Sequence, residues 1–277
     1  MQAVPAWAIL SLSINGLLFA TVLLLSRSSQ PPVHRSPVLP QANASGLKTS
    51  AQTAKTATFE PQIGDRQQLD YQQWVSLLAQ EADAIAAQPP DNLAVLMGDS
   101  ISLWFPSELL PANQTWLNQG ISGETTAGLL ERVDLLDRTQ PQTIFLMIGI
   151  NDLIWGKQDA EVLGNYRQLV EYLRWAHPQT QIIIQSILPH GAEQSTWQGR
   201  DRLLVLPNSR IRELNQSLKE IALDTNADYL DLYALFADTE GRLRSDLTTD
   251  GLHLNDQGYL VWRTAMALYE QLEGNRE

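Results

Sequence analysis

Four short segments of the chain contain residue types that nucleophilic catalysis uses. They are GDSIS at 98–102, NQGISGE at 118–124, GIND at 149–152 and DGLHLN at 250–255. A serine such as Ser100 is a poor nucleophile until an imidazole takes its proton, and a carboxylate can hold that imidazole in the correct tautomer. Asp250 and His253 stand three residues apart, and on a bend of the chain they can present both side chains to one site.

Two of the segments contain groups that could stabilise a developing negative charge. Gly123 has no Cβ and could present its N–H to an oxyanion, and the Asn151 amide is a donor that does not titrate. Each segment also has a purely structural interpretation. Glycines supply positive φ in turns, Asn turns the chain, and residues such as Asp99, Thr125 and Asn255 cap helices. Taken singly, the segments leave both interpretations open.

The histidines and the absence of cysteine narrow the chemistry. Of the four histidines (His34, His177, His190 and His253), only His253 has a carboxylate at a useful spacing. The sequence has no HExxH pattern and no cysteine, so thiol nucleophiles and cysteine zinc sites are excluded and a metal hydrolase has no support. We therefore predict no metal site.

Composition and charge describe an acidic globular domain. The chain has 277 residues, of which 44% are hydrophobic and 18% charged, and its formal charge is −12. No Asp or Glu precedes Glu60, and from Glu60 onward the formal charge is −16. Nucleic-acid binding requires clustered Lys and Arg, so nucleic acid is excluded as a general partner.

The N-terminal part differs from the rest of the chain. Residues 3–25 are apolar and uncharged over about the length that a bilayer requires, so 1–25 is predicted as a transmembrane anchor or uncleaved signal. A cleaved signal peptide and a buried core helix are the alternatives. Residues 26–64, rich in Ser, Gln, Pro, Ala and Thr, are predicted to be a disordered linker, and 65–277 to be the folded domain.

Strand and helix patterns alternate through the domain. A leading helix is predicted over 66–88, and short apolar runs predict five strands at 93–98, 115–120, 143–149, 181–188 and 227–232. Helical patterns lie at about 124–138, 159–176, 208–224 and 256–272. This alternation predicts an α/β fold with a parallel sheet, in which ligands bind at the carboxyl ends of the strands. Three of the four segments follow predicted strands, and the fourth precedes the final helix.

In this order the four segments resemble blocks I, II, III and V of the SGNH (GDSL-type) hydrolases. The resemblance is nearest to the platelet-activating-factor acetylhydrolase-like esterases and the thioesterase/lysophospholipase type. It implies a three-layer α/β/α sandwich, flavodoxin-like, with a five-stranded parallel sheet. We separately expect the catalytic domain to be monomeric. The resemblance also implies Ser100 as nucleophile, His253 as general base and Asp250 as its orienting group. Ser100, Gly123 and Asn151 would form the oxyanion hole, with no cofactor.

The substrate is less defined by the sequence. Trp104, Trp155 and Trp197 are candidate substrate-binding residues, with Phe105 and Arg200 as further guesses, although aromatics at these positions could equally pack beneath helices. The main hypothesis is a membrane-tethered serine esterase acting on short acyl or O-acetyl groups of a small or polysaccharide ester. A lysophospholipase or thioesterase acting on lipid, and a catalytically silent carbohydrate- or partner-binding module, are the alternatives.

The side of the membrane is predicted from conflicting features. Arg27 and Arg35 follow the apolar run and favour a cytoplasmic domain. The long linker is uncharged over much of its length, and the resembling enzymes often work outside the cytoplasm. We therefore expect a single-pass membrane protein with an extracytoplasmic catalytic domain.

Overall fold

The computed structural model describes residues 69–273. The predicted anchor at 1–25 and the predicted linker at 26–64 therefore lie outside the described residues. Within residues 69–273, no helix has both the length and the apolar character needed to cross a bilayer.

A five-stranded parallel sheet forms the centre of the fold. The strands are β1 (Leu93–Gly98), β2 (Thr115–Gly120), β3 (Thr143–Met147), β4 (Gln181–Gln185) and β5 (Asp228–Leu230), in the order β2-β1-β3-β4-β5. All four pairings are parallel, and β1 and β3 are buried along their whole length. The predicted number and type of strands is confirmed. β3, β4 and β5 are shorter than their apolar runs because the ends of those runs leave the sheet.

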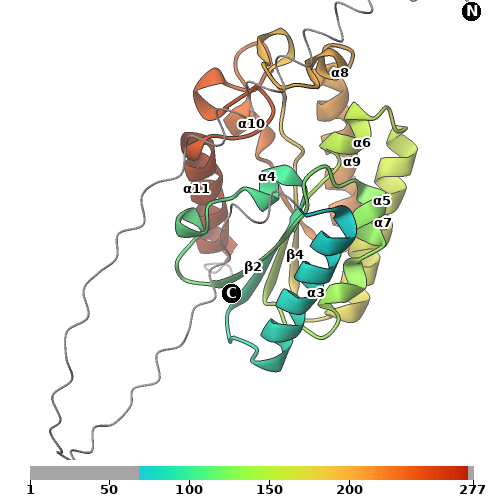
Figure 1. Cartoon of the computed structure of the whole chain (residues 1–277), viewed down its shortest axis with the longest axis vertical. Helices are drawn as coiled ribbons and strands as arrows, with labels where there is room; N and C mark the ends of the chain where they lie inside the picture. Colours follow the sequence, from blue (N-terminus) through green and yellow to red (C-terminus); the bar gives the residue numbers. More distant parts are fainter. Residues whose placement is uncertain (1–68, 274–277) are drawn as a thin grey trace, which may run out of the picture. The chain divides into compact units, whose positions relative to one another are not determined.

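Helices cover both sides of this sheet (Figure 1). α3 (Tyr71–Ala87) and α7 (Asp159–Ala176) lie on one side, and α11 (Asp256–Glu273) lies on the other. α9 (Asn208–Asp224) packs beside α7, and the shorter helices α4 (Ser100–Leu103), α6 (Ile150–Ile154), α8 (Arg200–Leu204) and α10 (Tyr233–Phe236) lie within the connections. Asp70 begins α3 with a capping box to Gln73, which explains why this helix starts later than predicted.

The single long helix predicted over 124–138 is wrong. The chain instead forms α5 (Thr126–Leu130) and a separate 3₁₀ turn, η2 (Val133–Leu136). The break falls at Arg132, whose backbone leaves the helical region and whose guanidinium is buried against the Glu124 carboxylate at 2.8 Å. The helical spacing of apolar residues continues across the break, so the pattern alone does not reveal it.

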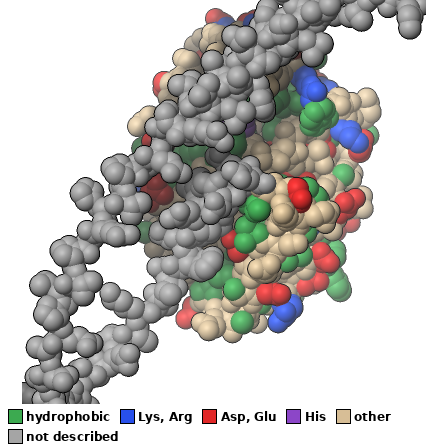
Figure 2. All heavy atoms as spheres, in the orientation of Figure 1, with side chains coloured by type: hydrophobic (Ala, Val, Ile, Leu, Met, Phe, Trp, Pro, Cys, Tyr) green, Lys and Arg blue, Asp and Glu red, His purple; other side chains and the backbone are tan. Residues whose placement is uncertain are grey.

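The surface of the domain carries the acidic balance of the sequence. Figure 2 shows Asp and Glu side chains spread over the visible face, with few Lys or Arg among them.

Candidate active site

Ser100 is presented at the carboxyl end of β1. The strand ends at Gly98, and Ser100 is the first residue of α4, with Asp99 as the N-cap whose Oδ1 accepts the Ile101 N–H at 2.9 Å. A Cβ at Gly98 would lie 2.3 Å from the Met147 carbonyl oxygen, so only glycine allows β1 and β3 to converge here. Asp99 therefore caps the helix while Ser100 faces the site.

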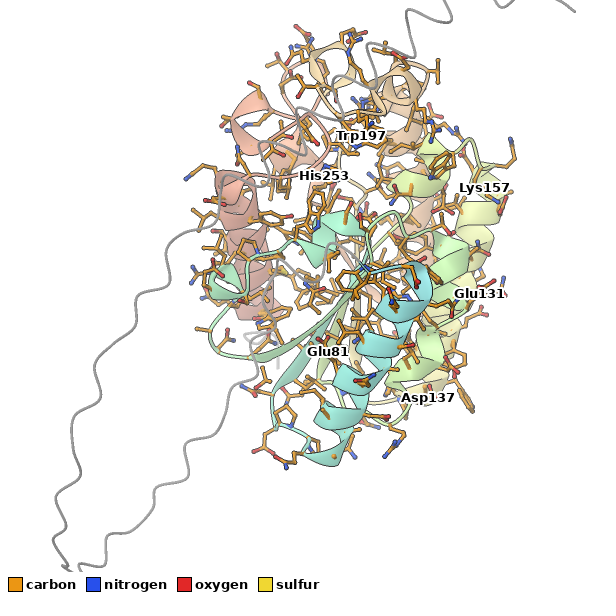
Figure 3. The ribbon with its side chains drawn as sticks, viewed as in Figure 1. Glu81, Glu131, Asp137, Lys157, Trp197 and His253 are labelled. Atoms are coloured by element: carbon orange, nitrogen blue, oxygen red, sulfur yellow. The ribbon has the colours of Figure 1, made fainter. Side chains whose placement is uncertain are left out.

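His253 and Asp250 lie beside Ser100. The Ser100 Oγ is 3.2 Å from His253 Nε2, and His253 Nδ1 is 2.8 Å from Asp250 Oδ2. The other Asp250 oxygen accepts the backbone N–H groups of His253 and Leu252 at 2.8 and 2.9 Å. Residues 153 positions apart in the chain are thus brought into one hydrogen-bonded series. Figure 3 places His253 and Trp197 at one end of the domain, with Asp137 and Glu81 toward the other.

The charge of Asp250 fixes the tautomer of His253. Burial acts to raise the pKa of Asp250, but hydrogen bonds from the His253 backbone N–H and imidazole outweigh it, so the pKa lies below its usual value. A carboxylate can only accept from Nδ1, so Nδ1 carries the proton and Nε2 is left with a lone pair toward the Ser100 hydroxyl.

The structure also places Gly123 and Asn151 in adjoining loops. Gly123 has a φ of +78°, which glycine tolerates well, and no atom occupies the space within 4 Å of where its Cβ would be. Asn151 lies in the first turn of α6, directly after β3, and its Nδ2 donates to the Glu124 carbonyl oxygen at 3.0 Å. This bond fixes the orientation of the Asn151 amide and ties it to the residue that follows Gly123.

Buried polar pairs hold these two loops together. Both carboxylate oxygens of Asp152 are bound by Thr126, one by its N–H at 2.9 Å and one by its hydroxyl at 2.7 Å. Glu124 pairs with Arg132, and Arg132 also donates to the Gln119 carbonyl oxygen at 2.9 Å. Thr126 and Arg132 were not predicted from the sequence, because neither lies in a position that a short motif singles out. Their contacts make the Gly123 and Asn151 loops one rigid unit.

Asp99 is almost fully buried behind Ser100. Burial, together with the negative charges of Asp152 and Glu124, raises the pKa of Asp99 to about 7, although the Ile101 N–H opposes the shift. An unfolded Asp titrates near 3.8, so between these values the native state holds a proton that the unfolded state releases. The native state therefore loses stability as pH rises from about 4 to 7.

Asp99→Asn is accordingly expected to stabilise the protein more at pH 8 than at pH 5. The amide does not titrate, and its Oδ1 can still accept the Ile101 N–H. We expect the melting temperature to rise by roughly 5 °C at pH 8 and by less at pH 5, measured by differential scanning calorimetry. The matched control is Asp83→Asn, an exposed carboxylate paired with Arg138. An Asp99→Asn effect that is equal at both pH values would mean that Asp99 is ionised in the fold.

The candidate substrate residues lie in different surroundings. Trp104 is 43% exposed and its ring lies 4.3 Å from the His253 ring, so it borders the site. Trp155 is 59% exposed and is covered on one face by the Arg202 guanidinium, 3.6 Å from the ring centre. Phe105 packs against Tyr259 and Trp262 in the core, which agrees with the alternative that this residue packs beneath the helices.

The connection after β4 holds the last two candidates. Trp197 is partly buried against the core, and its backbone N–H donates to the Asp250 carbonyl oxygen at 3.0 Å. The Arg200 guanidinium donates to the Glu193 carbonyl oxygen within the same connection. Across residues 69–273, no group of three or more His, Asp or Glu side chains is arranged to hold a metal ion.

Comparison with known proteins identifies the class to which this fold and site belong. The model of the GDSL-like Lipase/Acylhydrolase family matches residues 96–261, a span that contains all four segments described above. The match covers more than half of the chain, so the protein belongs to this family.

Solved structures show the same fold. A candidate platelet activating factor from Streptococcus pneumoniae is 27% identical, with a TM-score of 0.63 over 70% of this chain and 91% of that one. A GDSL-like lipase from Bacteroides thetaiotaomicron is 21% identical, with a TM-score of 0.62 over 72% and 98%. The esterase EstA from a Pseudoalteromonas species is 23% identical, with a TM-score of 0.51 over 66% and 100%.

Curated relatives match over a shorter share of their own length. An N-acylneuraminate cytidylyltransferase from Streptococcus agalactiae is 24% identical over 163 residues, which is 59% of this chain and 35% of the relative. The chain therefore spans about a third of the length of the curated relatives it matches.

Proposed function

We propose that this protein is a serine esterase that hydrolyses carboxylic esters of short acyl or O-acetyl groups through an acyl-enzyme. The observation that carries the proposal is the continuous series of hydrogen bonds from Ser100 through His253 to Asp250. Asp250 is ionised in this series, so His253 Nε2 is free to accept the serine proton. The series is the arrangement that activates a hydroxyl at neutral pH.

The reaction follows from these atoms. Ser100 Oγ attacks the ester carbonyl carbon while His253 Nε2 takes the hydroxyl proton. The bond to the leaving alcohol then breaks, and the imidazolium gives its proton to that oxygen. Water attacks the acyl-enzyme in the same way, releases the carboxylic acid and restores the Ser100 hydroxyl. Asp250 remains ionised throughout and stabilises the imidazolium.

The oxyanion of each tetrahedral intermediate would be bound by the Ser100 N–H, the Gly123 N–H and the Asn151 amide. Asn151→Ala removes one of these donors. We expect kcat to fall on the order of a hundredfold, or about 3 kcal/mol, with little change in KM, in a steady-state assay on p-nitrophenyl acetate. Asn165→Ala, which removes an amide donor to Thr126 in the same region, is the control. Equal losses in the two variants would mean that Asn151 only supports the loop.

The surroundings of Ser100 support a preference for small acyl groups. Ser100 and His253 are only 6% and 8% exposed, and Trp104 lies against the His253 ring. Chain length preference tests the proposal: the full chain, in detergent, is assayed on p-nitrophenyl esters from acetate to palmitate. An optimum at acetate or butyrate supports the short-acyl esterase. An optimum at long chains would instead indicate a lysophospholipase or thioesterase, and binding of an ester without turnover would indicate a silent binding module.

Membrane tethering forms part of the same proposal. The uncharged apolar run at 3–25 supports an anchor, and the long linker supports an extracytoplasmic domain. Resistance of the membrane-bound chain to carbonate extraction, with cleavage of the domain by protease added outside intact cells, is the expected result. Extraction by carbonate or protection from the protease would contradict the anchor or the orientation, respectively.

A further inference from the structure

The backbone carbonyl oxygen of Asp250 accepts three hydrogen bonds from one short segment. The donors are the Ser195 hydroxyl at 2.7 Å, the Thr196 N–H at 2.8 Å and the Trp197 N–H at 3.0 Å. These residues follow β4 and lie more than fifty positions before Asp250. A carbonyl oxygen has two lone pairs, so three donors saturate it. The Asp250 carbonyl group is therefore held more firmly than an ordinary loop carbonyl group.

The next residue of the loop is held as well. The Gly191 N–H donates to the Gly251 carbonyl oxygen at 2.7 Å. Gly251 has a φ of +85°, and a Cβ at this position would lie 2.6 Å from the Ser195 Cα. The two backbones are therefore in direct contact. The peptide units of Asp250 and Gly251 cannot rotate independently of residues 191–197.

His190 fixes this segment to the body of the domain. The buried imidazole accepts the Ala192 N–H at Nδ1, at 3.1 Å, and donates from Nε2 to the Leu206 carbonyl oxygen at 2.7 Å. Asn208, at the start of α9, accepts the His190 N–H and donates to the His190 carbonyl oxygen. Burial lowers the pKa of His190, which keeps the ring in the neutral form that these two bonds require.

We propose that residues 190–197 form a clamp that positions Asp250, with Ser195 as a positioning residue. This inference rests on the proposed function, since it concerns the carboxylate that orients His253. The carboxylate can align with Nδ1 only while the Asp250 backbone keeps its orientation, and the clamp supplies that orientation from outside the 250–255 segment. The connection after β4 therefore influences the hydrogen bonds that join Asp250, His253 and Ser100.

Ser195→Ala in the full chain tests the clamp. We expect kcat on p-nitrophenyl acetate to fall about tenfold with KM unchanged within about twofold, because the reacting groups are misaligned while the substrate surface is intact. A loosened carboxylate stabilises the imidazolium less. The acid limb of the kcat/KM profile should therefore move to lower pH.

Thr180→Val is the matched control. The Thr180 hydroxyl is buried and donates to the Pro141 carbonyl oxygen, but it precedes β4 at the opposite end of the sheet. This variant loses the same kind of bond and should lose similar stability, with kcat and the acid limb unchanged. The proposal is overturned if Ser195→Ala loses stability as Thr180→Val does and keeps the kcat and pH profile of the wild type.

A second measurement needs neither substrate nor turnover. The His253 Nδ1 proton, held by the Asp250 carboxylate, should give a far-downfield proton NMR signal in the wild type that moves upfield or broadens in Ser195→Ala. This readout separates the clamp from the proposed function, because it remains valid if no ester is hydrolysed. If Ser195→Ala does not fold, Ser195→Cys fills the same space with a weaker donor and should give a smaller change in the same direction. An unchanged signal would overturn the proposal.

Discussion

Ser100→Ala is expected to lower kcat for ester hydrolysis by about a millionfold. His253 Nε2 would then face a methyl group, and no acyl-enzyme could form. The loss is expected to be this large because the nucleophile and its base act as one unit, so removing one member disables the others. The measurement is a long-incubation assay of p-nitrophenyl acetate hydrolysis by wild type and variant at equal concentration.

The fold of the Ser100→Ala variant should be intact. Ser100 contributes its hydroxyl to His253, while the α4 cap is made by the side chain of Asp99, so the melting temperature should change little. A fluorophosphonate should add mass to the peptide that contains Ser100 in the wild type and leave the variant unlabelled. Turnover by the variant at more than about one per cent of the wild-type rate would remove Ser100 from the role of nucleophile.

Asp250→Asn is expected to lower kcat at pH 7 by about ten-thousandfold. An amide that keeps its oxygen on the His253 and Leu252 N–H groups turns its NH₂ toward Nδ1. The ring proton would move to Nε2, which would then donate toward Ser100 instead of accepting its proton. The pH profile of kcat/KM gives a second readout. The imidazolium loses the stabilising charge of its carboxylate partner, so the acid limb should move to lower pH.

Asp246→Asn is the matched control for this change. Asp246 is exposed and pairs with Arg244, four residues before Asp250 and outside the hydrogen-bonded series. The same chemical substitution there should leave kcat within about twofold, as for an exposed ion pair of small energetic value. A loss below about tenfold in Asp250→Asn would show that another group orients His253.

The regular elements could be predicted closely where their side chains pack on the core in a repeating pattern. The bounds of β1, α7 and α9 agree with the predicted ranges, because each is an uninterrupted apolar run or a long amphipathic repeat. The interrupted helix at 124–138 could not be predicted in the same way. The break falls at Arg132, which pairs with Glu124 in a buried contact that the spacing of apolar residues does not encode.

The residues of the candidate site also divide into those that the sequence could predict and those that it could not. Ser100, His253, Asp250, Gly123 and Asn151 lie in short motifs of the kind that the family resemblance makes visible, and the structure brings Ser100, His253 and Asp250 into contact. Ser195 lies in no such motif. Its contact joins a hydroxyl to a backbone carbonyl that every residue possesses, so nothing in the sequence marks the partner.

The last helix determines when during synthesis the site can exist. The Tyr259 hydroxyl donates to the Ile101 carbonyl oxygen at 3.0 Å, and the buried Trp262 packs on Phe105, so α11 lies directly against the nucleophile helix. A nascent chain still on the ribosome has made Ser100 long before it has made His253 or the helix that follows it. Such a chain carries an exposed nucleophile without its base. Hydrolytic activity should therefore begin only after residues beyond Trp262 have left the exit tunnel, which keeps the protein inactive until synthesis and folding are nearly complete.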